Sequence, residues 1–295
     1  MVKIFEYRNN SEELVFRFLC IKFKHNKVKN SRQKLYYNIL NCIRNDDHKN
    51  AKFYLFKYHK KYGYSNLHLN LTIANFSYDN HLTNDLITKS AKIYKQVVHN
   101  VQSNNFQKFI SDKKIAIIGN SNFQIGKGTG VEIDSHDICI RFNNYPQGYS
   151  EDYGTKCNIW ARGYGEEYEI EFKNPLQYNY IIFTGNFLNW DLKEYILDYL
   201  YSIYVMNPNA LIYSEEVFED KVQNATSGYI LIKYLLQFVP KENIKLYGFS
   251  FLDKNGEEDN THFYDDRCNI VGHSINEERK VLREMFLREG NNYDS

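Results

Sequence analysis

The stretch from Lys114 to Asn144, KIAIIGNSNFQIGKGTGVEIDSHDICIRFNN, constrains the fold more than any other part of the chain. The apolar run 115–118 ends at Gly-Asn-Ser, a loop with three glycines follows, and a second apolar run covers 138–142. This pattern predicts a strand, a glycine-bearing loop and another strand, as used where backbone approaches a phosphorylated ligand. The spacing matches neither the dinucleotide fingerprint nor the P-loop, so an ordinary structural turn stays open as an alternative.

Short apolar runs alternate with helical periodicity after Phe109. The predicted strands are Ile115–Ile118, Ile138–Phe142, Asn158–Ala161, Tyr180–Thr184, Ile203–Met206 and Ile244–Tyr247. The predicted helices are Leu192–Leu200, Gly228–Phe238 and Asn276–Leu287. Short apolar strands separated by helices favour an α/β fold, with a mainly parallel sheet that is covered on both faces.

A helical pattern occupies the chain from Gln33 to Asn100, with apolar residues on one face of each segment and short polar turns between segments. We therefore expect a mostly helical N-terminal region over 1–105 and a second, α/β domain over 106–295. Two helix pairs of roughly 34 residues each are similar in length to tetratricopeptide repeats. A module that binds a partner or an acceptor and plain scaffold helices are both open readings.

The amino-acid composition argues against several classes of protein. The chain has 37 basic and 36 acidic residues, so nothing suggests a dedicated nucleic-acid binder. No apolar run approaches the roughly 20 residues of a membrane span, and the N-terminus lacks a signal-peptide pattern. Five cysteines without a close CxxC pair favour reduced thiols in a cytoplasmic protein: Cys20, Cys42, Cys139, Cys157 and Cys268. The high Lys, Asn, Ile and Tyr content suggests an AT-rich genome and fits a bacterial source.

Residues 11–34 combine an apolar cluster with six basic residues that no acid interrupts from Lys22 onward. Such a segment could touch an anionic inner-membrane surface, where each basic residue contributes up to about 1 kcal/mol. A solvated basic helix face or hairpin is the alternative.

Four motifs in order carry a resemblance to the sialyltransferases, glycosyltransferase family 29. The segment 114–144, with GNS, EIDSHD and RFN, resembles the large sialylmotif, and NATSGYILIKYLLQFVPKENIKLYGFSF from Asn224 resembles the small one. His262-Phe263-Tyr264 is similar to motif III, and His273 with Glu278 is similar to the very small motif. The resemblance spans Lys114 to Glu278. It implies a GT-A-like, Rossmann-type sheet with helices on both faces.

The resemblance also implies a reaction. The donor is expected to be CMP-sialic acid and the acceptor a glycan hydroxyl, in one inverting, metal-independent displacement without a cofactor. No Asp-x-Asp triplet occurs in the sequence, and the acidic runs near 257–259 and 265–266 fit a solvated loop better than a metal site. CMP-Kdo is the alternative donor, because both sugars are acidic 2-keto acids carried on CMP.

The donor-binding residues expected from the resemblance follow strands or begin a helix. Asn120, Ser121 and Asn143 end two strands, at the edge where open α/β sheets bind ligands. Thr226, Ser227 and Gly228 open a helix whose N-terminus suits a phosphate, although an ordinary helix cap is the alternative. Gly248 and Phe249 end a later strand and are expected against the nucleoside; core packing is the other reading of Phe249. The family usually has proline where this chain has Ala225.

Two histidines are the expected catalytic residues. By resemblance His273 is the general base that takes the acceptor proton, a task suited to an imidazole that titrates near neutrality. His262 is expected to assist the departing phosphate. Glu278 is expected to support local structure. The secreted relatives join the two large motifs by a disulfide, whereas Ile115, Ala116 and the helix after Gly228 offer no cysteine here.

The expected biological setting is a cytoplasmic enzyme, peripheral to the inner membrane, that decorates lipooligosaccharide or capsule on a lipid-linked acceptor. A non-catalytic glycan- or nucleotide-binding module is the rival from another class, against which the two histidines argue. A nucleotide-binding oxidoreductase is excluded because the glycine fingerprint and its downstream acid are missing.

Overall fold

The computed structural model describes residues 30–63, 66–145, 148–163, 173–184, 188, 191–214, 222, 225–252, 261–262, 265–268 and 275–286. Of residues 30, 66, 213–214, 261–262 and 265–268 it describes the backbone alone. The chain forms two compact units. The first takes residues 1–95 and 188–201, and the second takes residues 96–187 and 202–295. The expected division of the chain into two domains, 1–105 and 106–295, stays a prediction.

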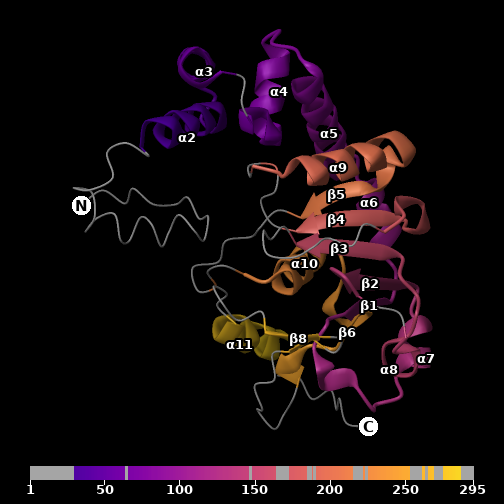
Figure 1. Cartoon of the computed structure of the whole chain (residues 1–295). Helices are drawn as coiled ribbons and strands as arrows, with labels where there is room; N and C mark the ends of the chain where they lie inside the picture. Colours follow the sequence, from indigo (N-terminus) through magenta and orange to yellow (C-terminus); the bar gives the residue numbers. More distant parts are fainter. Residues whose placement is uncertain are drawn as a thin grey trace. The chain divides into compact units, whose positions relative to one another are not determined.

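The elements follow one another as in Figure 1. The helices are α2 Asn30–Arg44, α3 His48–Tyr62, α4 Leu71–Asp79, α5 Asp85–Gln102, α6 Asn105–Ile110, α7 Gly130–Asp134, α8 Ser150–Tyr153, α9 Glu194–Met206, α10 Ser227–Leu235 and α11 Ile275–Phe286. The strands are β1 Ile115–Ile118, β2 Ile138–Phe142, β3 Ile159–Gly163, β4 Tyr180–Thr184, β5 Leu211–Ser214, β6 Ile244–Tyr247, β7 Thr261–His262 and β8 Asp265–Cys268. Short 3-10 turns cover Asn66–Leu69, Asn122–Gln124, Pro175–Gln177, Pro208–Ala210, Lys241–Asn243 and Ser250–Leu252.

A six-stranded sheet forms the centre of the second unit, in the order β5-β4-β3-β2-β1-β6. Every neighbouring pair is parallel, and Ile118 of β1 is in register with Arg141 of β2 and Tyr247 of β6. The strands lie side by side in Figure 1. This is the predicted Rossmann-type sheet, and β1, β2, β4 and β6 begin and end at the predicted residues.

Both faces of the sheet are covered, as its sequence requires. Ile115 and Ile117 belong to the larger core of the unit, whereas Ala116 and Ile118 belong to a second cluster with Ile133 of α7. Successive side chains of a strand point to opposite faces, so the continuous apolar run reflects two buried faces. Helix α10 packs on the larger core side, against β3, β4 and β5.

One predicted strand is wrong. Residues 203–206 are the last turn of α9, and the fifth strand is Leu211–Ser214. Ile196, Leu200 and Ile203 are buried at helical spacing, whereas Val205 and Met206 face solvent, as expected for a helix with one buried side. Apolar residues alone cannot distinguish a short strand from a buried helix turn, and here they suggested the wrong element.

The described part of the first unit is helical, as predicted. Helices α2 and α3 form a hairpin around a core that includes Ile39, Leu40 and Leu55. Asp47 begins α3, because its carboxylate accepts a hydrogen bond from the Asn50 amide at 3.2 Å. The tetratricopeptide comparison stays a prediction.

Candidate functional site

The predicted donor-binding residues lie at the carboxyl edge of the sheet. Asn120 and Ser121 follow β1, Asn143 follows β2, and Gly248 and Phe249 follow β6. Gly248 is buried and the other four are half-buried. Strand β1 lies between β2, the next strand in the chain, and β6, the last strand of this sheet, so the strand order reverses beside β1. Open α/β sheets bind their ligands outside the strand ends at such a switch point.

The ends of β1 and β6 touch through two glycines. Gly119 N donates to Tyr247 O at 2.8 Å, and Ser121 N donates to Gly248 O at 2.9 Å. A Cβ on Gly119 would lie 2.5 Å from the Gly248 carbonyl oxygen, closer than real Cβ contacts. Gly248 also has φ +63°, which favours glycine. Backbone from the two large motifs is therefore brought together at one place.

Asn143 is held in an unusual conformation by β3. Its φ is +53°, its carbonyl accepts from Trp160 Nε1 at 2.7 Å, and its Oδ1 accepts from Gly163 N at 3.2 Å. Arg162 Nη1 lies 3.4 Å from the same Oδ1 and donates to Asn144 Oδ1 at 3.1 Å. The amide oxygen of Asn143 is assigned by these bonds and faces β3. The Nδ2 group, which is a donor, therefore points away from β3.

Asn120 and Ser121 make local contacts that fix the end of β1. Asn120 Nδ2 donates to Phe142 O at 3.2 Å, which ties this end to that of β2. Ser121 Oγ accepts from Phe123 N at 3.3 Å, and its carbonyl accepts from Tyr153 Oη at 2.5 Å. Turn chemistry therefore accounts for part of what these two residues do.

The N-terminus of α10 reaches the same edge. A Cβ on Gly163, at the end of β3, would meet Ser227 Oγ at less than contact distance, and one on Gly228 would lie 3.0 Å from the Phe249 ring. Among the described residues, the N–H groups of Ser227 and Gly228 donate no hydrogen bond. The first N–H groups of a helix and its partial positive charge attract anions.

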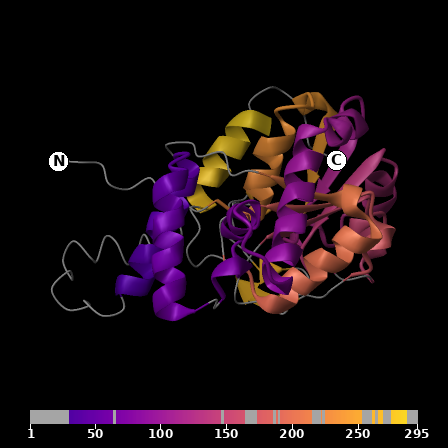
Figure 2. The ribbon, with the colours of Figure 1, turned by 90° about the horizontal axis from the view of Figure 1, so that it is seen from above.

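Glu278 of α11 anchors this helix start. The carboxylate is buried; Oε1 accepts from Thr226 N at 2.6 Å and Oε2 accepts from Thr226 Oγ1 at 2.7 Å. Thr226 Oγ1 in turn accepts from Tyr229 N at 3.2 Å, which caps α10. Figure 2 shows α11 in yellow beside α10 in orange. A residue of the fourth motif thus fixes the first residues of the second.

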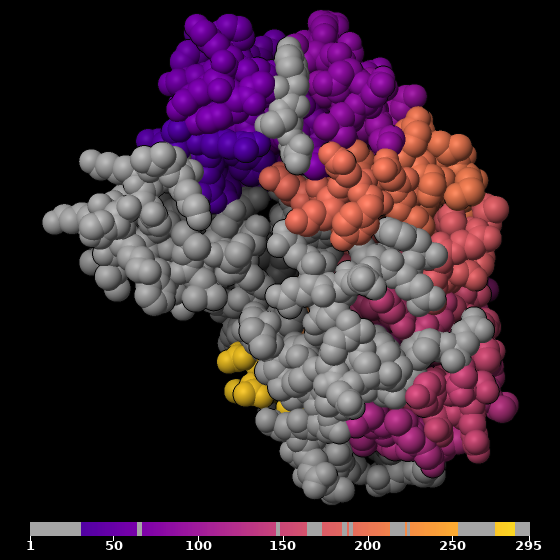
Figure 3. Space-filling view, in the orientation of Figure 1, coloured from indigo at the N-terminus to yellow at the C-terminus, as the bar shows by residue number. Residues whose placement is uncertain are grey.

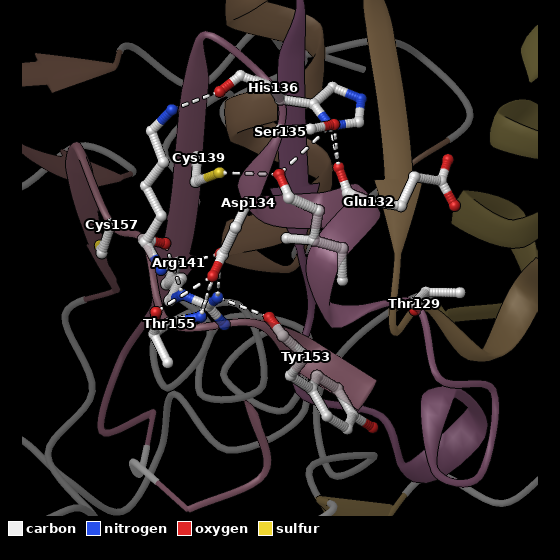
Figure 4. A network of polar contacts seen from close by, with 12 residues as sticks. Thr129, Glu132, Asp134, Ser135, His136, Cys139, Arg141, Tyr153, Thr155 and Cys157 are labelled. Carbon is white, nitrogen blue, oxygen red and sulfur yellow. Dashed lines mark hydrogen bonds and ion pairs between the residues drawn. The ribbon is translucent and has the colours of Figure 1, made fainter. Parts of the chain in front are cut away.

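The acidic residues of EIDSHD serve structure. Asp134 accepts hydrogen bonds from Thr155 N and Oγ1 and from Lys156 N, at 2.8 to 3.0 Å, as Figure 4 shows for Thr155. Arg141 lies 3.9 Å away and donates to Tyr153 O at 2.5 Å. These contacts join the α7 end of the motif to the loop after α8.

Glu132 and Asp137 hold neighbouring strands. Glu132 pairs with Lys245 and accepts from Tyr247 Oη at 2.9 Å; burial raises its pKa, but these partners outweigh it and the pKa is lowered. Asp137 Oδ2 accepts from Lys114 N at 2.9 Å, and this bond lowers the pKa of Asp137. Neither carboxyl group has the raised pKa expected of a general acid.

Cysteine chemistry is absent from the described part of the site. Among the described residues, Cys42, Cys139 and Cys157 are free thiols, and Cys42 lies in α2 of the first unit. Burial raises the pKa of Cys139 and of Cys157 to about 11, so both stay protonated near neutral pH and are poor nucleophiles. Cys20 and the side chain of Cys268 lie outside the described residues.

The side chains of the two expected catalytic histidines lie outside the described part of the chain. His262 is in β7, paired antiparallel with Asp265 of β8, but its side chain is outside the description. His273 lies outside the described residues altogether. No group of His, Cys, Asp and Glu that could hold a metal ion occurs among the residues described.

Sequence reasoning missed Arg162 and Gly163. Arg162 is buried at the end of β3 and contacts Asn143, and Gly163 makes room for the start of α10. Their position at the carboxyl end of a predicted strand was the available signal, since this is where ligand-binding edges are built. Within the described ranges, no helix is long and apolar enough to cross a membrane.

The family-model comparison agrees with the first of the four motifs. Residues 54–163 match the model of glycosyltransferase family 29 (sialyltransferase). This match starts within α3, so it includes helices before Lys114 that the motif comparison left out, and it ends before the second motif.

One curated relative is the sialyltransferase-like protein 2 of Oryza sativa subsp. indica, 42% identical over 45 residues, which are 15% of this chain and 11% of the relative. The chain therefore matches about a tenth of that relative's length. A crystal structure of a mammalian sialyltransferase with Gal-beta-1-3GalNAc-ortho-nitrophenol aligns with TM-score 0.44 and 19% identity, over 68% of this chain and 77% of that one. A second mammalian sialyltransferase structure aligns with TM-score 0.38 and 19% identity over the same shares. Over residues 54–163 the chain is therefore similar to glycosyltransferase family 29, the sialyltransferases.

Proposed function

We propose that this protein transfers sialic acid from CMP-sialic acid to a hydroxyl group of a glycan acceptor. The observation that supports it most is the meeting of two distant motifs: Gly119 lies against Gly248, and the start of α10 lies against Gly163. The resulting edge presents half-buried polar side chains beside helix N–H groups, as a nucleotide monophosphate requires.

Each part of the donor has a candidate partner at this edge. The N–H groups of Ser227 and Gly228 bind the CMP phosphate, because a helix N-terminus attracts negative charge. Asn143 Nδ2 donates to the nucleotide, since the opposite side of its amide faces β3. Asn120 and Ser121 contribute at the end of β1, and Phe249 and Gly248 lie against the nucleoside.

The chemical step follows from the leaving group. His273 takes the proton of the acceptor hydroxyl while that oxygen attacks the anomeric carbon, and the bond from this carbon to the CMP phosphate breaks in the same inverting step. His262 donates to the phosphate oxygens as their charge grows. The phosphate is stabilised by protein groups, so we expect no need for a metal ion.

The acceptor and setting are part of the proposal. An acidic sugar on a bacterial surface glycan, such as lipooligosaccharide or capsule, fits a cytoplasmic enzyme acting on a lipid-linked acceptor at the inner membrane. A CMP-Kdo transferase of the same fold is the second candidate, and a non-catalytic glycan- or nucleotide-binding module is the third.

The test is to incubate the protein with CMP-sialic acid and with CMP-Kdo in separate reactions with EDTA, and to follow CMP release. We expect release from CMP-sialic acid alone. The His273→Ala variant should release no CMP while binding it as the parent does, and exposed His81→Ala should behave like the parent. His262→Ala should lower turnover with little effect on acceptor affinity.

Four outcomes would contradict the proposal. Release from CMP-Kdo alone would assign the other donor. Binding of CMP without release from either donor would favour the non-catalytic module. Parent-like turnover by His273→Ala would reject it as the base, and strict dependence on added Mn²⁺ would reject the metal-free mechanism.

A further inference from the structure

Helix α3 has an outer face that combines lysines with exposed aromatic rings. Phe53 and Phe56 are 57% and 69% exposed, far more than a phenylalanine side chain usually is in a folded protein. Four exposed lysines surround them, and we define the α3 basic face as Lys49, Lys52, Phe53, Phe56, Lys57 and Lys60. The parts of α2 and α3 that face the viewer are drawn in indigo in Figure 3.

This face is opposite the buried side of the helix. Residues 49, 53, 56 and 60 recur at helical spacing, and Ala51, Leu55 and Tyr58 are buried in the core of the first unit. The helix contains no acidic residue. The packing of the unit therefore leaves the two rings and the lysines outward, where none of them supports the core.

The positive charge of the chain is concentrated in its N-terminal part, which includes α3. Residues 1–62 have 15 Lys or Arg and 5 Asp or Glu, whereas residues 63–295 have 22 and 31. The first part thus has a net charge of +10 and the rest −9, although the whole chain is close to neutral. Such an asymmetry favours an anionic partner for the N-terminal part.

We propose that the α3 basic face docks this protein on an anionic lipid surface. A helix that lies in a membrane interface buries aromatic or apolar side chains at the acyl boundary and places lysines at the headgroups. Single-stranded nucleic acid is instead bound in grooves that stack bases on rings, whereas this is the convex side of one helix. The proposal does not depend on the donor assignment, because none of these residues belongs to the candidate site.

The test uses the full chain and sedimentation with vesicles of phosphatidylcholine, with or without phosphatidylglycerol. We expect binding to the anionic vesicles alone, weakening as salt is raised. Phe53→Ser with Phe56→Ser should weaken binding by roughly tenfold or more, because the rings no longer enter the interface. Lys52→Gln with Lys57→Gln and Lys60→Gln should weaken it by a similar factor.

Matched controls carry the same changes elsewhere. Val131→Ser with Leu176→Ser removes two exposed apolar side chains, and Lys108→Gln with Lys113→Gln and Lys280→Gln removes three exposed charges. Both should bind vesicles like the parent. All variants should keep the parent's thermal midpoint, because the substituted side chains are exposed.

Equal vesicle binding by the α3 variants and the parent would overturn the proposal, as would equal losses in the controls. Binding of single-stranded RNA without binding of anionic vesicles would assign the face to nucleic acid and also overturn it. CMP release with a soluble acceptor should be the same for parent and α3 variants, so a failure here is distinguishable from a failure of the proposed reaction.

Discussion

At the scale of single residues, buried polar groups set the shape of the candidate site. Glu278 receives two hydrogen bonds from Thr226, and Asn143 receives one from Gly163. Hydrogen bonds to a buried charged group contribute more to stability than neutral ones, and a buried group that loses its partner is costly. These residues therefore position the groups expected to meet the donor.

Replacing Glu278 should affect both stability and donor binding. We expect Glu278→Ala to lower the free energy of unfolding by about 2–3 kcal/mol, because Thr226 loses its acceptor and a buried space opens. Glu278→Gln should cost about 1 kcal/mol, since one amide oxygen can still accept. Urea unfolding measures the first effect, and CMP titration should show weaker binding for both variants.

The neighbouring Glu277 is the matched control, because it is exposed on the same turn of α11. Its change to Gln should alter stability by at most about 0.5 kcal/mol. If Glu278→Ala were as stable as the parent and bound CMP equally well, the anchoring role would be wrong.

At the scale of elements, the site depends on how closely strand and helix ends approach. The ends of β1 and β6 are in contact at Gly119 and Gly248, and the start of α10 is in contact with Gly163 at the end of β3. A side chain at either place would separate the elements. Close-packed backbone has little room to adjust, so the cost depends on what the new atom meets.

Gly119→Ala should therefore be more harmful than Gly163→Ala. The new Cβ at 119 meets a carbonyl oxygen of the backbone, whereas the one at 163 meets the hydroxyl of Ser227, which can rotate. We expect Gly119→Ala to lower the free energy of unfolding by about 1–3 kcal/mol and to weaken CMP binding. Urea unfolding and CMP titration compare the two variants, and equal stability of both with the parent would contradict the close approach.

At the scale of the whole molecule, the two compact units differ in their secondary structure and in their titratable groups. The second contains the parallel sheet, and the first contains the α2–α3 hairpin and two neighbouring histidines, the buried His68 and the half-buried His59. His59 and His68 have ring centroids 5.3 Å apart. Burial, and then the nearby His59, lower the pKa of His68 from 6.5 to about 4; burial also lowers that of His59.

This pair should make stability fall in weak acid. Both histidines are neutral in the folded protein, and the unfolded chain binds protons first, below pH 6.5. Stability is thus highest above pH 6.5 and is lost as the pH falls toward 4, by up to about 3 kcal/mol for His68. Urea unfolding at pH 7 and pH 5 measures the loss, with circular dichroism as the signal.

His68→Gln should reduce this pH dependence, because its side chain can still bond Ser77, whose Oγ lies 3.1 Å from His68 Nε2, but cannot titrate. Exposed His81→Asn is the control and should keep the parent's dependence. An equal loss between pH 7 and pH 5 in the parent and in His68→Gln would show that His68 is not the cause.

The sequence by itself determined the sheet and the edge that matters. Apolar runs with sharp ends predicted β1, β2, β4 and β6 correctly, because a strand buried on both faces must be continuously apolar. Polar residues and glycines directly after those runs located the candidate site, since parallel strands end at one edge.

Only the tertiary structure decided which residues meet. Residues 203–206 became helix because their buried neighbours lie at helical spacing, and an apolar run of four residues does not reveal that. The contacts of Glu278 with Thr226 and of Gly119 with Gly248 join positions far apart in the chain. They depend on the folded path of the backbone, because local periodicity specifies an element but not its distant partner.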